Sequence, residues 1–216
     1  PDSSVYDLYI LDNGKILCAC GSGLYYSVDN FQTWDALINN LVVSRIKRDN
    51  YGNLYATSSD YLYKSTDQGL SWHIPYNISL DTIPQWPSNI FINDSGYIFT
   101  IQGYRQNGSL PPLGFKSTDF GVTWDRIWIG GGYGNFAANS LIENNTGTLF
   151  VSYLFFGPNF SDVKIIKKVL GGDWVTVYSG DTFAFDMYLY NQSLYFATGS
   201  WGSSALGVIK STDDGN

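Results

Sequence analysis

The sequence has little of the chemistry that marks helical proteins. Of its 19 acidic residues Glu143 is the only glutamate, so nearly all the acid is aspartate. Glutamate favours helices, whereas aspartate favours turns and helix caps. The imbalance predicts a chain with very little helix.

Basic runs and long apolar runs are also missing. The net charge is -7, and the 12 Lys and Arg residues form no extended cluster. This balance argues against partners such as nucleic acid or an anionic membrane surface. No stretch approaches about eighteen uninterrupted apolar residues, so we predict no membrane-spanning segment.

Cysteine and histidine are too few for a metal site. The only cysteines, Cys18 and Cys20, are two positions apart on a predicted strand, so their side chains point to the same face. A disulfide between them would be strained. We expect two buried small side chains. His73 has no zinc-ligand spacing around it, and the glycine-rich segment 130–134 lacks the Lys-Ser/Thr of a phosphate loop. The sequence therefore predicts neither a metal nor a cofactor.

Aromatic residues and glycine are abundant instead. Phe, Trp and Tyr make up 17% of the chain, and there are 23 glycines. Aromatic side chains suit strands, whereas Gly with Asn and Asp marks turns. The composition predicts an all-β protein.

One turn is repeated along the chain. It reads KSTDQGLSWH from Lys64 and KSTDFGVTWD from Lys116, with an incomplete copy, KSTDDGN, from Lys210. A weaker copy, YSVDNFQTWD, starts at Tyr26, and a degenerate one is expected around Asp173. The spacing fits a unit of about four short strands.

The residues before each copy repeat as well. An apolar strand (A), an Asn-, Asp- and Gly-rich turn and a second strand (B) precede a loop, strand C, the repeated turn and strand D. The expected units cover residues 4–38, 40–76, 82–128, 135–178 and 181–216, with the last one incomplete.

The repeated turn resembles the Asp-box, or BNR repeat, of β-propellers. Sialidases, xyloglucanase-type glycoside hydrolases, sortilin-like receptors and photosystem assembly factors carry this motif. The resemblance covers essentially the whole chain and implies a β-propeller of four-stranded antiparallel blades. We expect a single propeller domain or a fragment of one that closes with roughly six to eight blades. The fold hosts many activities, so the motif implies fold rather than function.

The box residues are expected to be structural. Ser and Asp should accept hydrogen bonds from backbone N–H groups, Gly should supply a positive φ, and Trp should bury its ring. The residues in question are Ser27, Asp29, Trp34, Ser65, Asp67, Gly69, Trp72, Ser117, Asp119, Gly121, Trp124, Ser211, Asp213 and Gly215.

The working face is expected at the opposite end of the strands. There the B–C and D–A loops vary in length and composition, as loops that carry a site on a rigid frame do. They hold flat aromatic side chains and a guanidinium suited to sugar rings and hydroxyls. The candidate ligand-binding residues are Trp86, Tyr104, Arg105, Tyr133 and Trp201.

An enzyme is the alternative. The sialidase branch implies a Tyr-Glu nucleophile pair, but Glu143 falls at an A–B turn, away from the working face. A glycosidase with two aspartates stays open, and its weak candidates are Asp81, Asp162, Asp181 and Asp186.

We therefore expect a non-catalytic module that recognises a glycan or a protein partner, with a glycoside hydrolase or a structural component of a larger assembly as alternatives. Six Asn-x-Ser/Thr sequons favour a secreted or cell-surface protein: Asn77, Asn93, Asn107, Asn144, Asn159 and Asn191.

Overall fold

The structure is a computed structural model that describes most of the chain. The described residues are 4–58, 61–77, 89–101, 104–105, 113–129, 135–156, 161–180, 183–191, 193–199 and 207–213. Within these ranges every regular element is a β-strand. The prediction of an all-β chain is confirmed.

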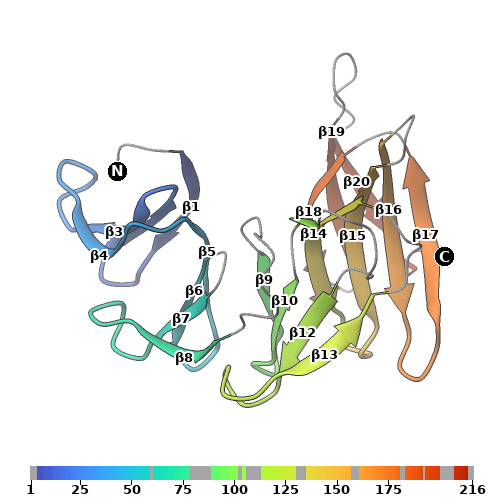
Figure 1. Cartoon of the computed structure of the whole chain (residues 1–216), viewed down its shortest axis with the longest axis horizontal. Helices are drawn as coiled ribbons and strands as arrows, with labels where there is room; N and C mark the ends of the chain where they lie inside the picture. Colours follow the sequence, from blue (N-terminus) through green and yellow to red (C-terminus); the bar gives the residue numbers. More distant parts are fainter. Residues whose placement is uncertain are drawn as a thin grey trace. The chain divides into compact units, whose positions relative to one another are not determined.

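The strands form antiparallel sheets in which sequence neighbours pair (Figure 1). The first sheet has the order β1 (Val5–Ile10), β2 (Ile16–Cys20), β3 (Gly23–Ser27), β4 (Asp35–Asn39). The second has the order β5 (Val43–Arg48), β6 (Leu54–Ser58), β7 (Tyr61–Ser65), β8 (His73–Asn77). The third contains β9 (Asn89–Ile92), β10 (Ile98–Ile101), β12 (Leu113–Ser117) and β13 (Asp125–Trp128) in the same meander.

The last two sheets depart from four strands. The fourth contains β14 (Asn135–Glu143), β15 (Leu149–Phe156), β16 (Ser161–Lys168) and β17 (Trp174–Gly180), with the two-residue β11 (Tyr104–Arg105) added beside β14. The fifth has the described strands β18 (Phe183–Tyr190), β19 (Ser193–Gly199) and β20 (Gly207–Ser211). The A–B–C–D order predicted from the sequence is present in the first four sheets.

Asx chemistry builds the A–B turns. In the second sheet the Asp49 carboxylate accepts hydrogen bonds from the backbone N–H groups of Tyr51 and Asn53, both at 2.9 Å, and Gly52 has a φ of 88°. Asn93 and Asn144 accept equivalent pairs of backbone N–H groups in the third and fourth sheets. In these three sheets an Asp or Asn side chain therefore satisfies two backbone donors of the A–B turn.

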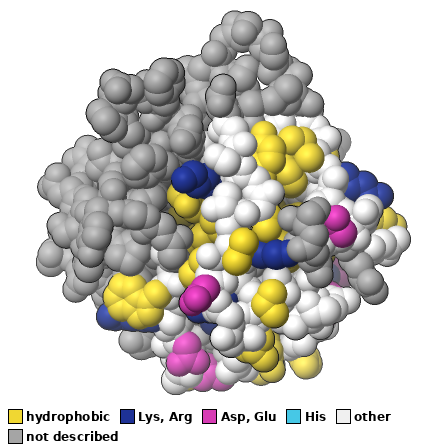
Figure 2. All heavy atoms as spheres, turned by 90° about the vertical axis from the view of Figure 1, so that its right-hand side faces the viewer, with side chains coloured by type: hydrophobic (Ala, Val, Ile, Leu, Met, Phe, Trp, Pro, Cys, Tyr) yellow, Lys and Arg dark blue, Asp and Glu magenta, His cyan; other side chains and the backbone are white. Residues whose placement is uncertain are grey.

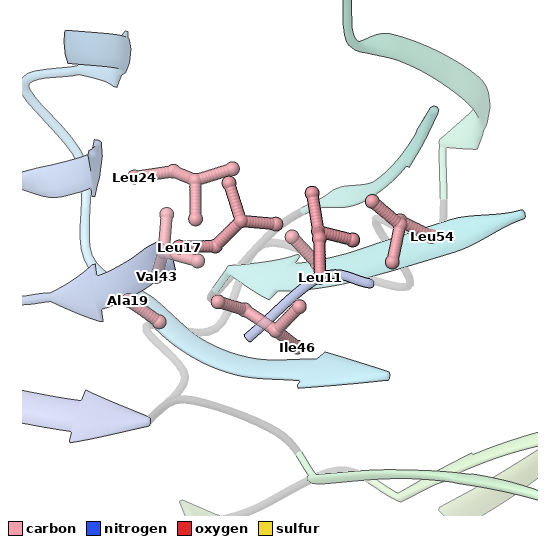
Figure 3. Packing of buried hydrophobic residues seen from close by; sticks show 8 residues of the cluster. Leu11, Leu17, Ala19, Leu24, Val43, Ile46 and Leu54 are labelled. Atoms are coloured by element: carbon pink, nitrogen blue, oxygen red, sulfur yellow. The ribbon is translucent and has the colours of Figure 1, made fainter. Parts of the chain in front are cut away.

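The chain forms two compact units. The first consists of Pro1–Ile98 and Ser117–Trp124, and the second of Phe99–Lys116 and Asp125–Asn216. In the first unit aliphatic side chains of the first two sheets point toward one another, as Figure 3 shows for Leu17, Leu24 and Ile46. Cys18 and Cys20 are both buried there, and the Cys20 thiol donates to the Gly23 carbonyl at 3.4 Å.

The second unit has a core of its own. Phe150, Val151 and Ile165 are fully buried on β15 and β16. The outer strands leave some apolar side chains in water, among them Trp128 and Val175. In the described part of the face in Figure 2, hydrophobic side chains lie in separate patches among charged and polar ones.

Candidate functional site

The repeated turns share one hydrogen-bonding plan. In the second sheet the Ser65 hydroxyl donates to the Asp67 carboxylate at 2.7 Å and accepts the Gly69 N–H at 2.8 Å. The same carboxylate accepts the backbone N–H of Ser71 at 2.9 Å. The matching bonds in the first and third sheets join Ser27, Asp29, Phe31 and Thr33, and Ser117, Asp119, Gly121 and Thr123. Each carboxylate thus satisfies turn donors that would otherwise lack a partner.

These hydrogen bonds stabilise the ionised form of the aspartates. The side-chain hydroxyl of Thr123, followed by its backbone N–H, lowers the pKa of Asp119 to about 2. Thr33 does the same for Asp29, whose pKa is also about 2, and Ser71 lowers the pKa of Asp67 further. Such carboxylates are unsuited to act as general acids near neutral pH.

Each of these turns contains two successive residues in the left-handed region. Gln68 and Gly69 have φ values of 58° and 74°. Phe120 and Gly121 follow the same pattern, at 61° and 89°. In the first sheet Phe31, with a φ of 71°, occupies the position that is glycine in the other two turns.

The box tryptophans are partly buried. Trp72 packs against the core of the first two sheets, and Trp124 against a cluster that includes Leu62 and Ile90. The indole N–H of Trp124 donates to the Gly121 carbonyl at 3.0 Å. The indole nitrogen of Trp72 is buried without a hydrogen-bond partner in the described part of the chain.

One turn departs from the expected pattern, and another is described only in part. Around Asp173, where a degenerate copy was expected, the chain makes a tight turn closed by the Gly172 N–H and the Val169 carbonyl at 2.9 Å. No hydrogen bond to the Asp173 carboxylate is found among the described residues. In the fifth sheet the Ser211 hydroxyl donates to Asp213 at 2.8 Å, and Gly215 lies outside the described residues.

Lysine side chains connect successive repeats. The Lys15 ammonium donates to the Gly69 carbonyl at 2.8 Å, and the Lys64 ammonium donates to the Phe120 carbonyl at 3.2 Å. In the second unit Lys116 forms an ion pair with Glu143 at 2.9 Å. This role was not predicted, although the lysine that opens the motif at Lys64 and Lys116 is a signal in the sequence.

The described part of the first unit contains a surface groove of about 480 Å³. We call it the Lys15 groove; its lining residues are Asn13, Gly14, Lys15, Tyr26, Val28, Asn30, Leu37 and Leu70. Lys15 is only 7% exposed, and burial lowers its pKa. The volume is within the range of about 300–1,000 Å³ typical of ligand pockets.

Most of the predicted working face lies outside the described residues. This holds for Asp81, Trp86, Tyr133, Asp181 and Trp201. The backbone of Tyr104 and Arg105 forms β11, paired with Phe136 and Ala137, where a loop was expected. The backbone of Asp162 lies in β16.

Asp186 is the candidate acid whose side chain the structure describes. It is exposed, and its carboxylate accepts the backbone N–H of Met187 at 2.9 Å. Within the described ranges no group of three or more His, Cys, Asp or Glu side chains could hold a metal ion. The same ranges contain no helix long and apolar enough to cross a membrane.

The chain matches no protein-family model and no curated protein sequence. Similar solved structures exist. A gluconolactonase from Xanthomonas campestris has a TM-score of 0.65 and 13% identity, over 99% of this chain and 74% of that protein. The GH93 α-L-arabinofuranosidase of Fusarium graminearum, in complex with arabinobiose, has a TM-score of 0.57 and 13% identity, over 95% and 80%.

A third similar structure is much longer. PorZ, a surface component of the type IX secretion system of Porphyromonas gingivalis, has a TM-score of 0.63 and 14% identity. The alignment covers 98% of this chain and 33% of PorZ. The gluconolactonase and the arabinofuranosidase are β-propellers, so the four-stranded antiparallel sheets of this chain have propeller proteins as structural neighbours.

Proposed function

We propose that the chain belongs to an Asp-box β-propeller that recognises a glycan or a protein partner without catalysis. The ligand binds through the B–C and D–A loops, and Trp86, Tyr104, Arg105, Tyr133 and Trp201 contribute to its site. The protein is secreted or displayed at the cell surface.

The sheets and the turns support the propeller. Four-stranded meanders with one repeated C–D turn are the expected form of propeller blades. Two of the similar structures are propellers whose names refer to sugars or sugar derivatives, and PorZ is a surface component. These likenesses support the proposed ligand class and the proposed location. Binding to a panel of polysaccharides tests the ligand class.

The main support for recognition without catalysis is that the box carboxylates are ionised and hydrogen-bonded within their turns. Asp29, Asp67 and Asp119 are the described carboxylates with lowered pKa values, and all three are bound by turn donors. They stabilise the frame and are poor proton donors. The aromatic and amide-rich loops at the other end supply stacking surfaces and hydrogen bonds for a ligand.

A glycoside hydrolase is the second candidate, favoured by the likeness to the arabinofuranosidase. It would need two carboxyl groups at a suitable separation, drawn from Asp81, Asp162, Asp181 and Asp186.

A panel of polysaccharides tests both candidates on the full-length protein. The recognition proposal predicts saturable binding of at least one polysaccharide without release of reducing ends or unsaturated products. Turnover that is abolished by one of the changes Asp81→Asn, Asp162→Asn, Asp181→Asn or Asp186→Asn would establish the hydrolase instead.

A further inference from the structure

The first unit contains the same contact between repeats twice. The A–B turn of the first sheet lies beside the box turn of the second, where Lys15 donates to the Gly69 carbonyl. The A–B turn of the second sheet lies beside the box turn of the third, where Tyr51 contacts Phe120.

The turns of the two places align, although their lysines come from different positions: Lys15 corresponds to Asn53, and Lys64 corresponds to Tyr26. Each ammonium nevertheless donates to a carbonyl of the neighbouring box turn. Each A–B turn is closed by the same pair of backbone hydrogen bonds, which start at Leu11 in one and Asp49 in the other. Asn13 therefore corresponds to Tyr51. The two box turns align on their left-handed residues, so Gln68 corresponds to Phe120.

Aromatic rings occupy the second place. Tyr51 and Phe120 meet edge to face, with centroids 5.2 Å apart and an interplanar angle of 89°. The Lys64 ammonium lies 5.4 Å from the Phe120 centroid and 5.5 Å from that of Tyr55. One partly buried cation thus contacts two rings, an arrangement that both cation–π attraction and ring packing stabilise.

The first place is open and is the Lys15 groove. The Lys15 ammonium lies 4.3 Å from the Tyr26 centroid, and in the described part of the chain no second ring contacts it. Asn13, which lines the groove, and Gln68 have the sequence positions that correspond to Tyr51 and Phe120 in the second place. Val28 and Leu70 at the rim are 71% and 74% exposed.

The charge around the groove is negative. Asp29 lies between the lining residues Val28 and Asn30, and Asp67 acts electrostatically on Lys15. Both carboxylates are ionised at neutral pH, whereas the Lys15 side chain is only 7% exposed. A ligand with basic groups flanking the groove would match this rim.

We propose that the Lys15 groove binds an aromatic side chain of a partner protein, presented on a segment with flanking Lys or Arg residues. The incoming ring takes the place that Phe120 has in the next repeat and makes the second cation–π contact with Lys15. A sugar ring fits less well, because the one aromatic ring lining the groove, Tyr26, already has the Lys15 ammonium over it. This site is separate from the loop face of the proposed function.

Blocked peptides test the proposal on the full-length protein. The probe is Lys-Ser-Phe-Ser-Lys, and its control is the same peptide with Ala in place of Phe. In an amide NMR titration the Phe peptide should shift the signals of Gly14, Gly69 and Leu70 saturably, and the Ala peptide should bind at least about tenfold more weakly. Equal binding of the two peptides, or binding elsewhere, overturns the proposal.

The chain supplies matched variants. The double change Asn13→Tyr with Gln68→Phe installs the ring pair of the next repeat and should abolish binding of the Phe peptide. The reverse change, Tyr51→Asn with Phe120→Gln, should create a second site that shifts Gly52 and Gly121. Persistent binding after the first change contradicts the proposal.

A single substitution covers the case in which the filled variant does not fold. Lys15→Met keeps the apolar walls of the groove but removes the cation. The affinity for the Phe peptide should fall about tenfold. Unchanged affinity in a folded Lys15→Met protein overturns the cation–π assignment. Displacement of the peptide by a neutral polysaccharide would identify the groove as a sugar site and also overturn the proposal.

Discussion

At the scale of single residues, the box turns show how a left-handed backbone conformation favours glycine over other residues. Gly69 and Gly121 occupy a left-handed position that an L side chain adopts only with strain. Phe31 adopts the same conformation, with a φ of 71°, and its ring contacts Trp34 edge to face at 5.8 Å. The ring contact offsets part of the backbone strain.

Separating strain from ring contact gives the first prediction. Phe31→Ala and Phe31→Gly both delete the ring, but only glycine relieves the positive φ. The free energy of unfolding should therefore be about 1 kcal/mol higher for Phe31→Gly than for Phe31→Ala, as measured by urea denaturation. At the neighbouring Gln32, whose φ is not positive, the order should reverse, with Ala the more stable. An Ala variant at Phe31 as stable as the Gly variant would contradict this reasoning.

The lowered pKa of Asp119 gives a pH dependence. Its folded-state pKa of about 2 is below the ordinary 3.8, so its stabilising contribution is fully present above about pH 4 and is lost as pH falls through about 2. Asp119→Asn lacks this titration. The difference in urea midpoint between wild type and Asp119→Asn should be largest near pH 5 and shrink toward pH 2. A constant difference over that range would argue against the hydrogen-bonded carboxylate as the cause.

At the scale of elements, the contact between repeats depends on which donor hydrogen-bonds to the carbonyl of the box glycine. The Gly121 carbonyl accepts the indole N–H of Trp124, whereas the Gly69 carbonyl accepts Lys15 and the Trp72 indole nitrogen is buried without a described partner. A buried donor without an acceptor is destabilising. The hydrogen bond from Lys15 offsets part of that loss by connecting the two sheets.

Removing the lysine should release the carbonyl to the tryptophan. In Lys15→Met we expect the Trp72 indole N–H to donate to the Gly69 carbonyl, as Trp124 does to Gly121. Its proton resonance should move downfield and exchange more slowly with solvent, while the Trp124 resonance stays in place. No change at Trp72 would show that the indole cannot reach the Gly69 carbonyl.

Strands and turns were largely predictable, because their signals are local. Alternating apolar residues and the Asn-, Asp- and Gly-rich turns predict an A strand and a B strand in each repeat, and β1 and β2, or β14 and β15, are such pairs. The pairing of β11 with β14 was not predictable, since two residues in a loop have no periodicity. The contacts of Lys15 with Gly69 and of Lys64 with Phe120 join residues more than 50 positions apart, so a local pattern does not identify their partners.

At the scale of the whole molecule, we propose that the two ends of the strands have different roles. One end contains the A–B turns and the box turns, which satisfy backbone donors and connect neighbouring sheets. The other end contains the B–C and D–A loops, most of whose proposed binding residues lie outside the described part of the chain. This division is the central claim of the account.

One set of four variants tests that claim, with thermal unfolding and ligand binding measured on each full-length protein. Trp86→Ala and Trp201→Ala should weaken binding to the polysaccharide or partner about tenfold and leave the unfolding temperature nearly unchanged. Asp67→Ala and Asp119→Ala should lower the free energy of unfolding by about 1–3 kcal/mol and leave the affinity of the folded protein unchanged. If the tryptophan variants unfold the protein, or the aspartate variants abolish binding at full stability, the assignment of frame and site to opposite ends is wrong.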